Sequence, residues 1–176
     1  MKKYYSSRGD AGQTDQLGES RIAKDHLRIQ TVGALDEASA AIGVARAQAG
    51  GPEINELLKS VQLDLYRIMT LVSLEKPNPE KFPDLDGSRT AWLEDQIARF
   101  GEDLEKPAGF ILPGENMVSA AFGLARTIVR RAERQAVSLD QQGMLFSQTA
   151  LPYLNRLSSL CFVLELMAAQ KEGSTP

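Results

Sequence analysis

Apolar residues recur at helical spacing in five segments of this chain, and no other feature constrains its fold as strongly. The spacing predicts helices over residues 34–49, 53–74, 88–105, 116–137 and 147–170. The second segment carries a wide apolar stripe formed by Ile54, Leu57, Leu58, Val61, Leu65, Ile68, Met69 and Val72. No convincing strand pattern appears. Five amphipathic helices predict an all-α fold, an antiparallel five-helix bundle.

The lead segment differs from the rest of the chain. It holds Gly9, Gly12 and Gly18 among many Ser, Asp and Gln residues and lacks a sustained apolar period, so it is expected to form an ordered or orderable loop. A single domain over residues 1–176 is expected to have three parts: a loop segment over 1–33, a helical bundle over 34–172 and a disordered tail over 173–176. The apolar stripes of the second and last helices are broad, which favours oligomerisation.

Composition and charge exclude several classes of protein. The chain has 23 acidic and 20 basic side chains, and this balance argues against general nucleic-acid binding, because a phosphate backbone selects broadly basic surfaces. The single cysteine, Cys161, rules out an intrachain disulfide, and its apolar neighbours favour a buried, inert thiol. With His26 as the only histidine, no zinc or haem site is expected. No apolar run is long enough to span a membrane, and a single cysteine fits a reducing cytosol, so a cytoplasmic protein is expected.

The segment over 116–137 carries a stripe of arginines. Four charged side chains fall at offsets of 0, 4, 7 and 8 and therefore share one helix face: Arg126, Arg130, Glu133 and Arg134. The opposite face is expected to pack on the core through Leu124, Ile128, Ala132 and Ala136. Like charges one turn apart repel each other. The stripe therefore indicates a multiply charged anion or acidic groups from elsewhere, and a solvated basic face is the alternative.

Three short segments carry further chemical signals. Residues 6–14 read Ser-Ser-Arg-Gly-Asp-Ala-Gly-Gln-Thr, which can turn backbone N–H groups toward an anion or simply form turns. Residues 110–114 read Phe-Ile-Leu-Pro-Gly and predict a rigid lead-in to a helix, for which a core position of Phe110 is the alternative to a functional role. Asn155 lies in the middle of the last helix, where its amide needs a partner on a ligand or on another helix.

Six motifs follow one another along the chain: Gly9-Asp10-x-Gly12-x-Thr14, Lys24-Asp25, Gly33-x-Leu35-Asp36-Glu37, Phe110-Ile111-Leu112-Pro113-Gly114, Arg126 through Arg134, and Leu154-Asn155-Arg156-Leu157-Ser158. In this order and spacing they resemble the PduO-type ATP:cob(I)alamin adenosyltransferases. The resemblance extends from about residue 4 to residue 168. Its most specific part is the arginine-rich run followed by Asn-Arg-Leu-Ser.

The resemblance implies a homotrimer with active sites at its subunit interfaces. Members of this family transfer the 5′-deoxyadenosyl group of ATP to the cobalt of cob(I)alamin, giving adenosylcobalamin and triphosphate. It therefore implies ATP and a reduced corrinoid as substrates, and Mg²⁺ bound to the phosphates. A reductase that donates electrons and an adenosylcobalamin-dependent enzyme are the implied protein partners.

The resemblance also implies roles for individual residues. The phosphates would be held by Ser6, Arg8, Gly9, Asp10, Gly12, Gln13, Thr14 and Lys24. The nucleotide would be positioned by Arg130, Glu133 and Asn155, with Asn155 also near the phosphate-bound Mg²⁺. Asp36 and Arg126 would pair across the subunit interface beside the corrinoid, and Phe110 would crowd the lower face of the corrin ring. The residues implied in catalysis are Arg130, Phe110, Asp36 and Arg126.

The chain departs from the usual family pattern at a few positions. Arg8, Ser39, Glu115 and Ser159 stand where the family usually has Thr, Asn, Gly and Asp. Two other classes of function therefore remain open. One is a non-catalytic bundle that binds ATP or a corrinoid and stores or delivers adenosylcobalamin. The other is a structural bundle whose arginines only make ion pairs at an interface.

Overall fold

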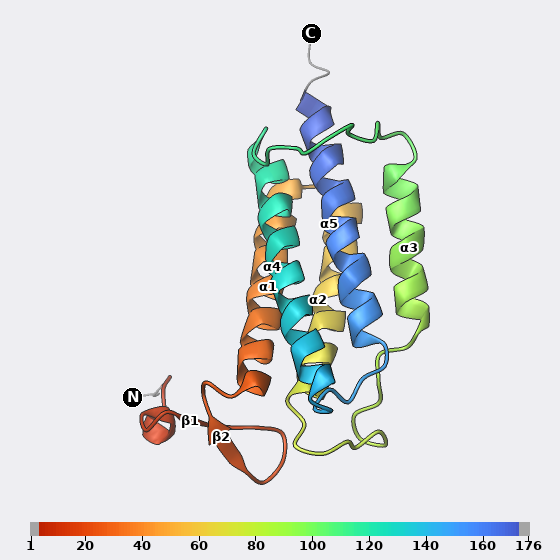
Figure 1. Ribbon diagram of the computed structural model, residues 1–176. Coiled ribbons are helices and arrows are strands. Elements are labelled where there is room, and N and C mark those ends of the chain that lie inside the picture. The colour runs from red at the N-terminus through yellow and green to blue at the C-terminus, as the bar shows by residue number, and fades with distance from the viewer. Residues whose placement is uncertain (1–3, 173–176) are drawn as a thin grey trace.

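The chain folds into a bundle of five long helices that run alternately up and down (Figure 1). The computed structural model describes residues 4–172, with the side chains of 171 and 172 left aside. The helices are α1 (Leu27–Ala49), α2 (Pro52–Val72), α3 (Ser88–Gly101), α4 (Met117–Gln141) and α5 (Ala150–Glu172). The predicted five-helix bundle is confirmed. The predicted tail over 173–176 lies outside the described residues.

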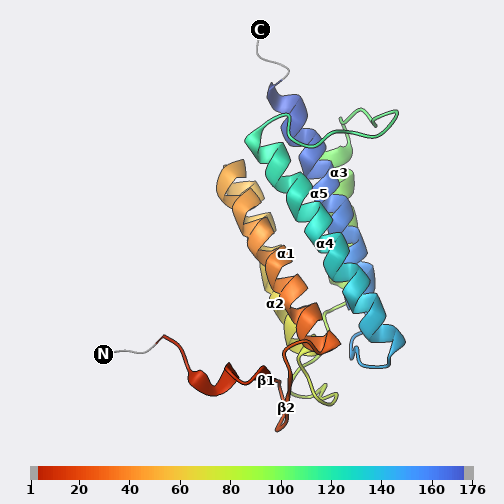
Figure 2. The same ribbon diagram turned by 60° about the vertical axis from the view of Figure 1, so that its left-hand side comes forward.

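The helices pack side by side in the order α2, α1, α4, α5, α3. Helix α4 packs between α1 and α5, α2 packs on α1, and α3 packs on α5 (Figure 2). The gap between α2 and α3 is bridged by Arg89, whose Nε and Nη2 donate to Asp64 Oδ2 at 2.9 and 2.7 Å. Tyr153 on α5 donates its hydroxyl to the same oxygen at 2.7 Å. This largely buried polar cluster therefore ties α2, α3 and α5 together.

Helix α1 begins seven residues earlier than predicted, so the boundary of the loop segment at residue 33 is wrong. The His26 side chain caps the helix, because its Nδ1 accepts the backbone N–H of Arg28 at 3.1 Å. Arg28 is buried and donates to the carbonyl of Val72 at the end of α2, at 2.6 Å. The first turn is thus held by polar contacts, which an apolar period does not reveal.

A small antiparallel hairpin precedes the bundle, so the expectation that the chain contains no strand is wrong. Strand β1 (Gln13–Asp15) pairs with β2 (Arg21–Ala23), with Thr14 opposite Ile22. A 3₁₀ turn, η1 (Ser7–Gly9), comes just before them. Each strand is only three residues long, too short for a visible alternation of apolar and polar residues.

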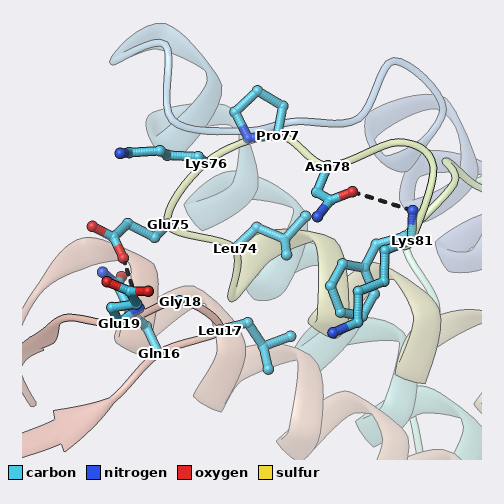
Figure 3. Close-up of a pocket in the computed structure, with 11 residues that line it drawn as sticks. Gln16, Leu17, Gly18, Glu19, Leu74, Glu75, Lys76, Pro77, Asn78 and Lys81 are labelled. Atoms are coloured by element: carbon cyan, nitrogen blue, oxygen red, sulfur yellow. Dashed lines mark hydrogen bonds between the residues drawn. The ribbon is translucent and has the colours of Figure 1, made fainter.

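The hairpin is joined to the bundle at the loop after α2. Leu17 and Leu74 form a bridge between the two segments, and the Glu75 carboxylate accepts the backbone N–H groups of Glu19 and Ser20 at 3.1 and 3.3 Å. Figure 3 shows these residues around a cavity of about 690 Å³, with Lys81 on its far side. This join positions the lead segment beside the lower end of the bundle.

Local contacts set the ends of the other helices. Asn116 and Ser119 form a reciprocal capping box at the start of α4. Asp84 accepts hydrogen bonds from Ser147 Oγ, Gln148 N and Thr149 Oγ1 at 2.6, 2.8 and 2.9 Å, so α5 begins at Ala150 rather than at residue 147. Helix α3 ends at Gly101, before the predicted residue 105, and α4 continues past residue 137 to Gln141.

Within the part of the chain described above, no helix has the length and apolar content needed to cross a bilayer.

Candidate functional site

The arginine stripe lies on α4, and two of its guanidinium groups face outward. Arg130 and Arg134 are exposed, whereas the Arg126 side chain is only 22% exposed. The predicted opposite face is partly wrong, because Leu124 is 54% exposed while Ala132 and Ala136 are buried. Because α4 packs between α1 and α5, its buried face differs from the predicted one. The buried apolar residues of α4 are Ala121, Phe122, Ala125, Val129, Ala132, Ala136 and Leu139.

Asn155 finds its partner on the neighbouring helix. Its Nδ2 donates to Glu133 Oε1 of α4 at 3.0 Å, and its Oδ1 accepts from Arg156 at 2.7 Å. Arg156 in turn donates from Nε to Glu94 of α3 at 2.7 Å. The fold therefore brings together Glu133 and Asn155, which lie 22 residues apart in sequence. Both belong to the predicted nucleotide site, and Arg130 lies one turn before Glu133 on α4.

Arg126 is held by a carboxylate of its own protomer. Its Nε donates to Glu165 Oε2 at 2.8 Å, and its guanidinium lies 5.7 Å from the centroid of the Phe162 ring. Glu165 is only 2% exposed. Burial raises the pKa of the nearby Cys161 thiol to about 12, which agrees with the expected inert thiol.

Asp36 lies on the exposed side of α1. Its neighbour Glu37 forms an ion pair with Arg131 of α4. Since Glu165 occupies Arg126 Nε within the protomer, the pair between Asp36 and Arg126 across an interface stays a prediction.

The predicted phosphate loop forms a compact turn. Asp10 N donates to Ser7 O at 3.2 Å, and Gly12, with φ of +78°, accepts the backbone N–H of Lys24 at 2.9 Å through its carbonyl. The Lys24 ammonium lies against Gly9, where an added Cβ would be 3.0 Å from Nζ. The fold thus brings Lys24 to the glycine loop although the two are well separated in sequence.

Arg8 is anchored in this turn by Asp15. Its Nη2 lies 3.2 Å from Asp15 Oδ1, and Arg21 Nε reaches the same oxygen at 3.0 Å. Arg21 also donates to the carbonyls of Arg8 and Gln13 at 2.6 and 3.1 Å. The unusual arginine at position 8 therefore belongs to a network of three charged side chains on the hairpin.

The two halves of the predicted nucleotide site lie on different parts of the protomer. The turn containing residues 6–14 runs outward beside the start of α1, whereas Arg130 and Asn155 belong to α4 and α5 (Figure 2). Among the described residues, no hydrogen bond or ion pair connects this turn to either of them.

Phe110 lies on the surface, so the alternative that placed it in the core is wrong. Its side chain is fully exposed, and Leu112 and Met117 nearby are also exposed. Gly114, with φ of +116°, ends this loop just before α4. An apolar loop of this kind is typical of a binding surface.

Comparison with known proteins identifies the family of the chain. The sequence model described as "Cobalamin adenosyltransferase" matches residues 4–168. The chain belongs to the cobalamin adenosyltransferase family. Among relatives of this family, a corrinoid adenosyltransferase from Mycobacterium leprae is 35% identical over 96% of this chain and 92% of its own length. A cobalamin adenosyltransferase from Cupriavidus metallidurans is 35% identical over 99% and 92% of the two chains.

Solved structures of cobalamin adenosyltransferases share the fold. A PduO-type ATP:corrinoid adenosyltransferase variant from Lactobacillus reuteri, complexed with cobalamin and ATP, matches with a TM-score of 0.89 and 28% identity. The match covers 97% of this chain and 96% of that one. Another variant of the enzyme from this organism, complexed with ATP, matches with a TM-score of 0.86 and 29% identity over 96% and 95% of the two chains.

Sequence reasoning missed several residues that contact members of the candidate site. Glu165 was detectable as a lone charge within the apolar run from Leu160 to Met167. Arg21 and Glu94 gave no such signal, because each is one of many charges on polar segments and acquires its partner only through the fold.

Proposed function

We propose that this chain transfers the 5′-deoxyadenosyl group of ATP to the cobalt of cob(I)alamin, giving adenosylcobalamin and triphosphate. The observation that carries the proposal is the likeness, with a TM-score of 0.89 over 97% of the chain, to a family structure complexed with cobalamin and ATP. Reduced cobalt is itself a strong nucleophile, so the protein's task is to align the two substrates and to stabilise the departing triphosphate.

Positive charge for the triphosphate comes from Arg130 on α4 and Lys24 beside the glycine turn. The forked donors of a guanidinium match phosphate oxygens, and Arg130 is exposed and available to a ligand. Ser6, Gly9, Asp10, Gly12, Gln13 and Thr14 would contribute backbone and side-chain contacts to the same phosphates, together with Arg8. Glu133 and Asn155, already joined by a hydrogen bond, would orient the nucleotide.

A homotrimer would complete the site by adding the turn of one subunit to the α4–α5 surface of the next. Two observations support this assembly: the two halves belong to separate parts of one protomer, and Leu124 and Val44 are exposed on the adjacent helices α4 and α1. In this arrangement Asp36 of the partner subunit would bind the terminal nitrogens of Arg126, because Nε is occupied by Glu165.

Mixing two inactive variants tests the shared site. Lys24→Ala and Arg130→Ala homotrimers should each be nearly inactive, whereas trimers reassembled from both should recover part of the activity. Recovery is expected because some interfaces of a mixed trimer combine an intact turn with an intact Arg130. If the mixed trimers stay inactive although their subunits are shown to exchange, then Lys24 and Arg130 belong to the site of the same protomer, and the shared site is wrong.

Phe110 would lie beneath the corrin ring. Its full exposure supports this role, since covering an apolar side chain with a flat apolar ligand removes it from water and lowers the free energy. A phenyl ring offers no ligand atom, so it would exclude water and the base of cobalamin from the lower face of cobalt. Loss of that axial donor makes Co(II) easier to reduce.

The residues near Asn155 fit a phosphate-bound Mg²⁺. The Asn155 carbonyl and the Glu133 carboxylate supply the oxygen atoms that this ion prefers, and both lie on the surface where the phosphates would bind. Among the described residues, no group of three or more His, Cys, Asp or Glu side chains could hold a metal. The ion would therefore be held by the phosphates with help from Asn155, and it would neutralise phosphate charge.

Anaerobic incubation with ATP and chemically reduced cobalamin tests the activity. Formation of a light-sensitive cobalt–carbon bond is expected, whereas binding of both substrates without product would indicate a protein that only stores or delivers adenosylcobalamin. We also propose a reductase and an adenosylcobalamin-dependent enzyme as partners, because cobalt must be reduced before transfer and the product is used afterwards. The cytoplasmic location expected from the single cysteine stays a prediction.

A further inference from the structure

Glu165 belongs to a cavity that the proposed roles leave without an occupant. The cavity has a volume of about 230 Å³ and lies between the loop that follows Phe110 and the end of α5. Its walls are formed by Ile111, Leu112, Pro113, Gly114, Glu115, Ser119, Glu165, Leu166 and Ala169. Most of these residues are apolar. The lining also holds two carboxylates, of which Glu115 is exposed to solvent whereas Glu165 is buried.

The two oxygens of this carboxylate have different surroundings. Oε2 accepts the Nε hydrogen of Arg126 at 2.8 Å. Oε1 is also buried, yet it has no hydrogen-bond partner among the described residues. A buried oxygen of this kind is rare, because the loss of its hydration is not compensated. The free oxygen therefore indicates a hydrogen-bond donor that is absent from the polypeptide itself.

Gly123 on α4 provides the space for this oxygen. A Cβ added at Gly123 would lie 2.7 Å from Glu165 Oε1 and 3.2 Å from the Cβ of Pro113. Any larger residue would displace the carboxylate or the Pro113 loop. The missing side chain therefore leaves room for both Oε1 and Pro113 beside α4, and Pro113 is itself part of the cavity wall.

The chemistry of the walls favours a neutral donor. Arg126 already balances the charge of Glu165. The hydroxyl of Ser119 is used by Asn116, to whose carbonyl it donates at 3.0 Å. A primary carboxamide suits such a place, because it carries N–H donors without charge. The periphery of a corrinoid bears primary carboxamides on short alkyl arms, whereas ATP carries no such group.

We propose that this cavity takes one peripheral carboxamide of the corrinoid and that Glu165 Oε1 accepts its N–H. The proposal rests on the proposed function, in which Phe110, adjacent to Ile111, lies beneath the corrin ring. Glu165 then links the corrinoid to Arg126 through its two oxygens, and it selects corrinoids by the group at one position of the ring.

Corrinoids altered at single carboxamides test this role. In each analogue one peripheral carboxamide of cobalamin is hydrolysed to a carboxylate, and its KM is measured with preformed Co(I) and saturating ATP. One analogue should show a KM about tenfold or more above that of cobalamin, because a carboxylate cannot donate to Oε1 and is repelled by it. If wild-type protein treats every analogue like cobalamin, the proposal is overturned, and the cavity holds water only.

Glu165→Gln provides the reciprocal measurement. Arg126 Nε requires the amide oxygen of the new side chain, so its NH₂ group faces the cavity and can donate to a carboxylate. The discriminated analogue should then bind better than cobalamin or equally well, while the KM for ATP stays unchanged. Glu53→Gln, which removes a surface partner of Arg99, is the matched control and should keep the wild-type preference. A preference that persists unchanged in folded Glu165→Gln protein would contradict the proposal.

The proposed activity and the proposed role of Glu165 can be refuted independently of each other. If wild-type protein forms no cobalt–carbon bond with unmodified cobalamin, the proposed function fails. If it does so but no analogue is discriminated, only the role of Glu165 is wrong. The comparison on wild-type protein requires no variant to fold.

Discussion

Removal of Arg126 should destabilise the fold far more than its partial exposure suggests, because it strands the Glu165 carboxylate. Glu165 is 2% exposed and Arg126 is 22% exposed. Breaking a buried pair by removing one partner typically raises the free energy of the folded state by about 3–5 kcal/mol. Arg126→Met keeps most of the side-chain volume, so nearly all of this effect should come from the uncompensated carboxylate rather than from a cavity.

The two partners should differ in their effects. In Glu165→Leu the remaining guanidinium can reach water and keeps its contact with Phe162. Its loss of stability should therefore be smaller, about 1–3 kcal/mol. At about 2–4 °C per kcal/mol for a chain of this size, Arg126→Met should lower Tm by ~6–20 °C. The double variant Arg126→Met/Glu165→Leu should regain much of the loss, because a buried pair can be replaced by apolar residues at little net change.

Thermal and urea unfolding of the four proteins in this cycle provide the measurement. Arg99→Met is the matched control, since its pair with Glu53 is largely exposed and should contribute only about 0–1 kcal/mol. The reasoning is refuted if Arg126→Met is no more damaging than Arg99→Met. It is equally refuted if the single effects of Arg126→Met and Glu165→Leu simply add in the double variant.

Three further outcomes are expected. Phe110→Ala should change the free energy of unfolding by no more than about 0.5 kcal/mol, because Phe110 is fully exposed. The variant should slow turnover strongly when Co(II) must be reduced on the protein and far less when Co(I) is supplied. Equal slowing in both assays would exclude a role at cobalt. Cys161, whose pKa burial raises to about 12, should resist thiol reagents in the native protein and react after denaturation, so rapid native labelling would contradict its burial. Burial alone would raise the pKa of Asp84, yet hydrogen bonds from Ser147, Gln148 N and Thr149 hold it below the usual 3.8. Asp84 therefore stabilises the fold above that pH, and this stabilisation is lost as pH falls through the lower pKa of the folded state. In urea unfolding, the loss of stability caused by Asp84→Asn should be full at neutral pH and should shrink in acid.

The helices could be predicted from sequence because apolar burial determines them. Leu57, Leu58 and Leu65 of α2 show the period of their buried face directly. The start of α1 could not be predicted in this way, since it depends on the His26 cap and on the contact of Arg28 with a carbonyl 44 residues away. The hairpin was missed because each of its strands is only three residues long, and its position depends on Glu75, which lies beyond α2.

The candidate site could be predicted only in part. Glu133 and Asn155 were expected together, and the fold joins them. For Arg126 the sequence suggested an acidic partner on another subunit, and it did not show the contact with Glu165 within the protomer. The lone charge of Glu165 in an apolar run was detectable, but the sequence did not specify which residue would pair with it. Leu124 was expected in the core but is exposed. Helix periodicity predicts which side of a helix is apolar only approximately, and packing against α1 and α5 determines which residues on that side are buried.

Product stoichiometry tests adenosyl transfer most directly. With preformed cob(I)alamin and limiting ATP under anaerobic conditions, the purified protein should release one triphosphate for each adenosylcobalamin formed, and Arg130→Ala should reduce the rate about 10²–10³-fold while the bundle stays folded. Equal amounts of the two products are expected because a single displacement at C5′ yields both. Release of ADP or pyrophosphate, or bound ATP and corrinoid that never react, would contradict the proposed function.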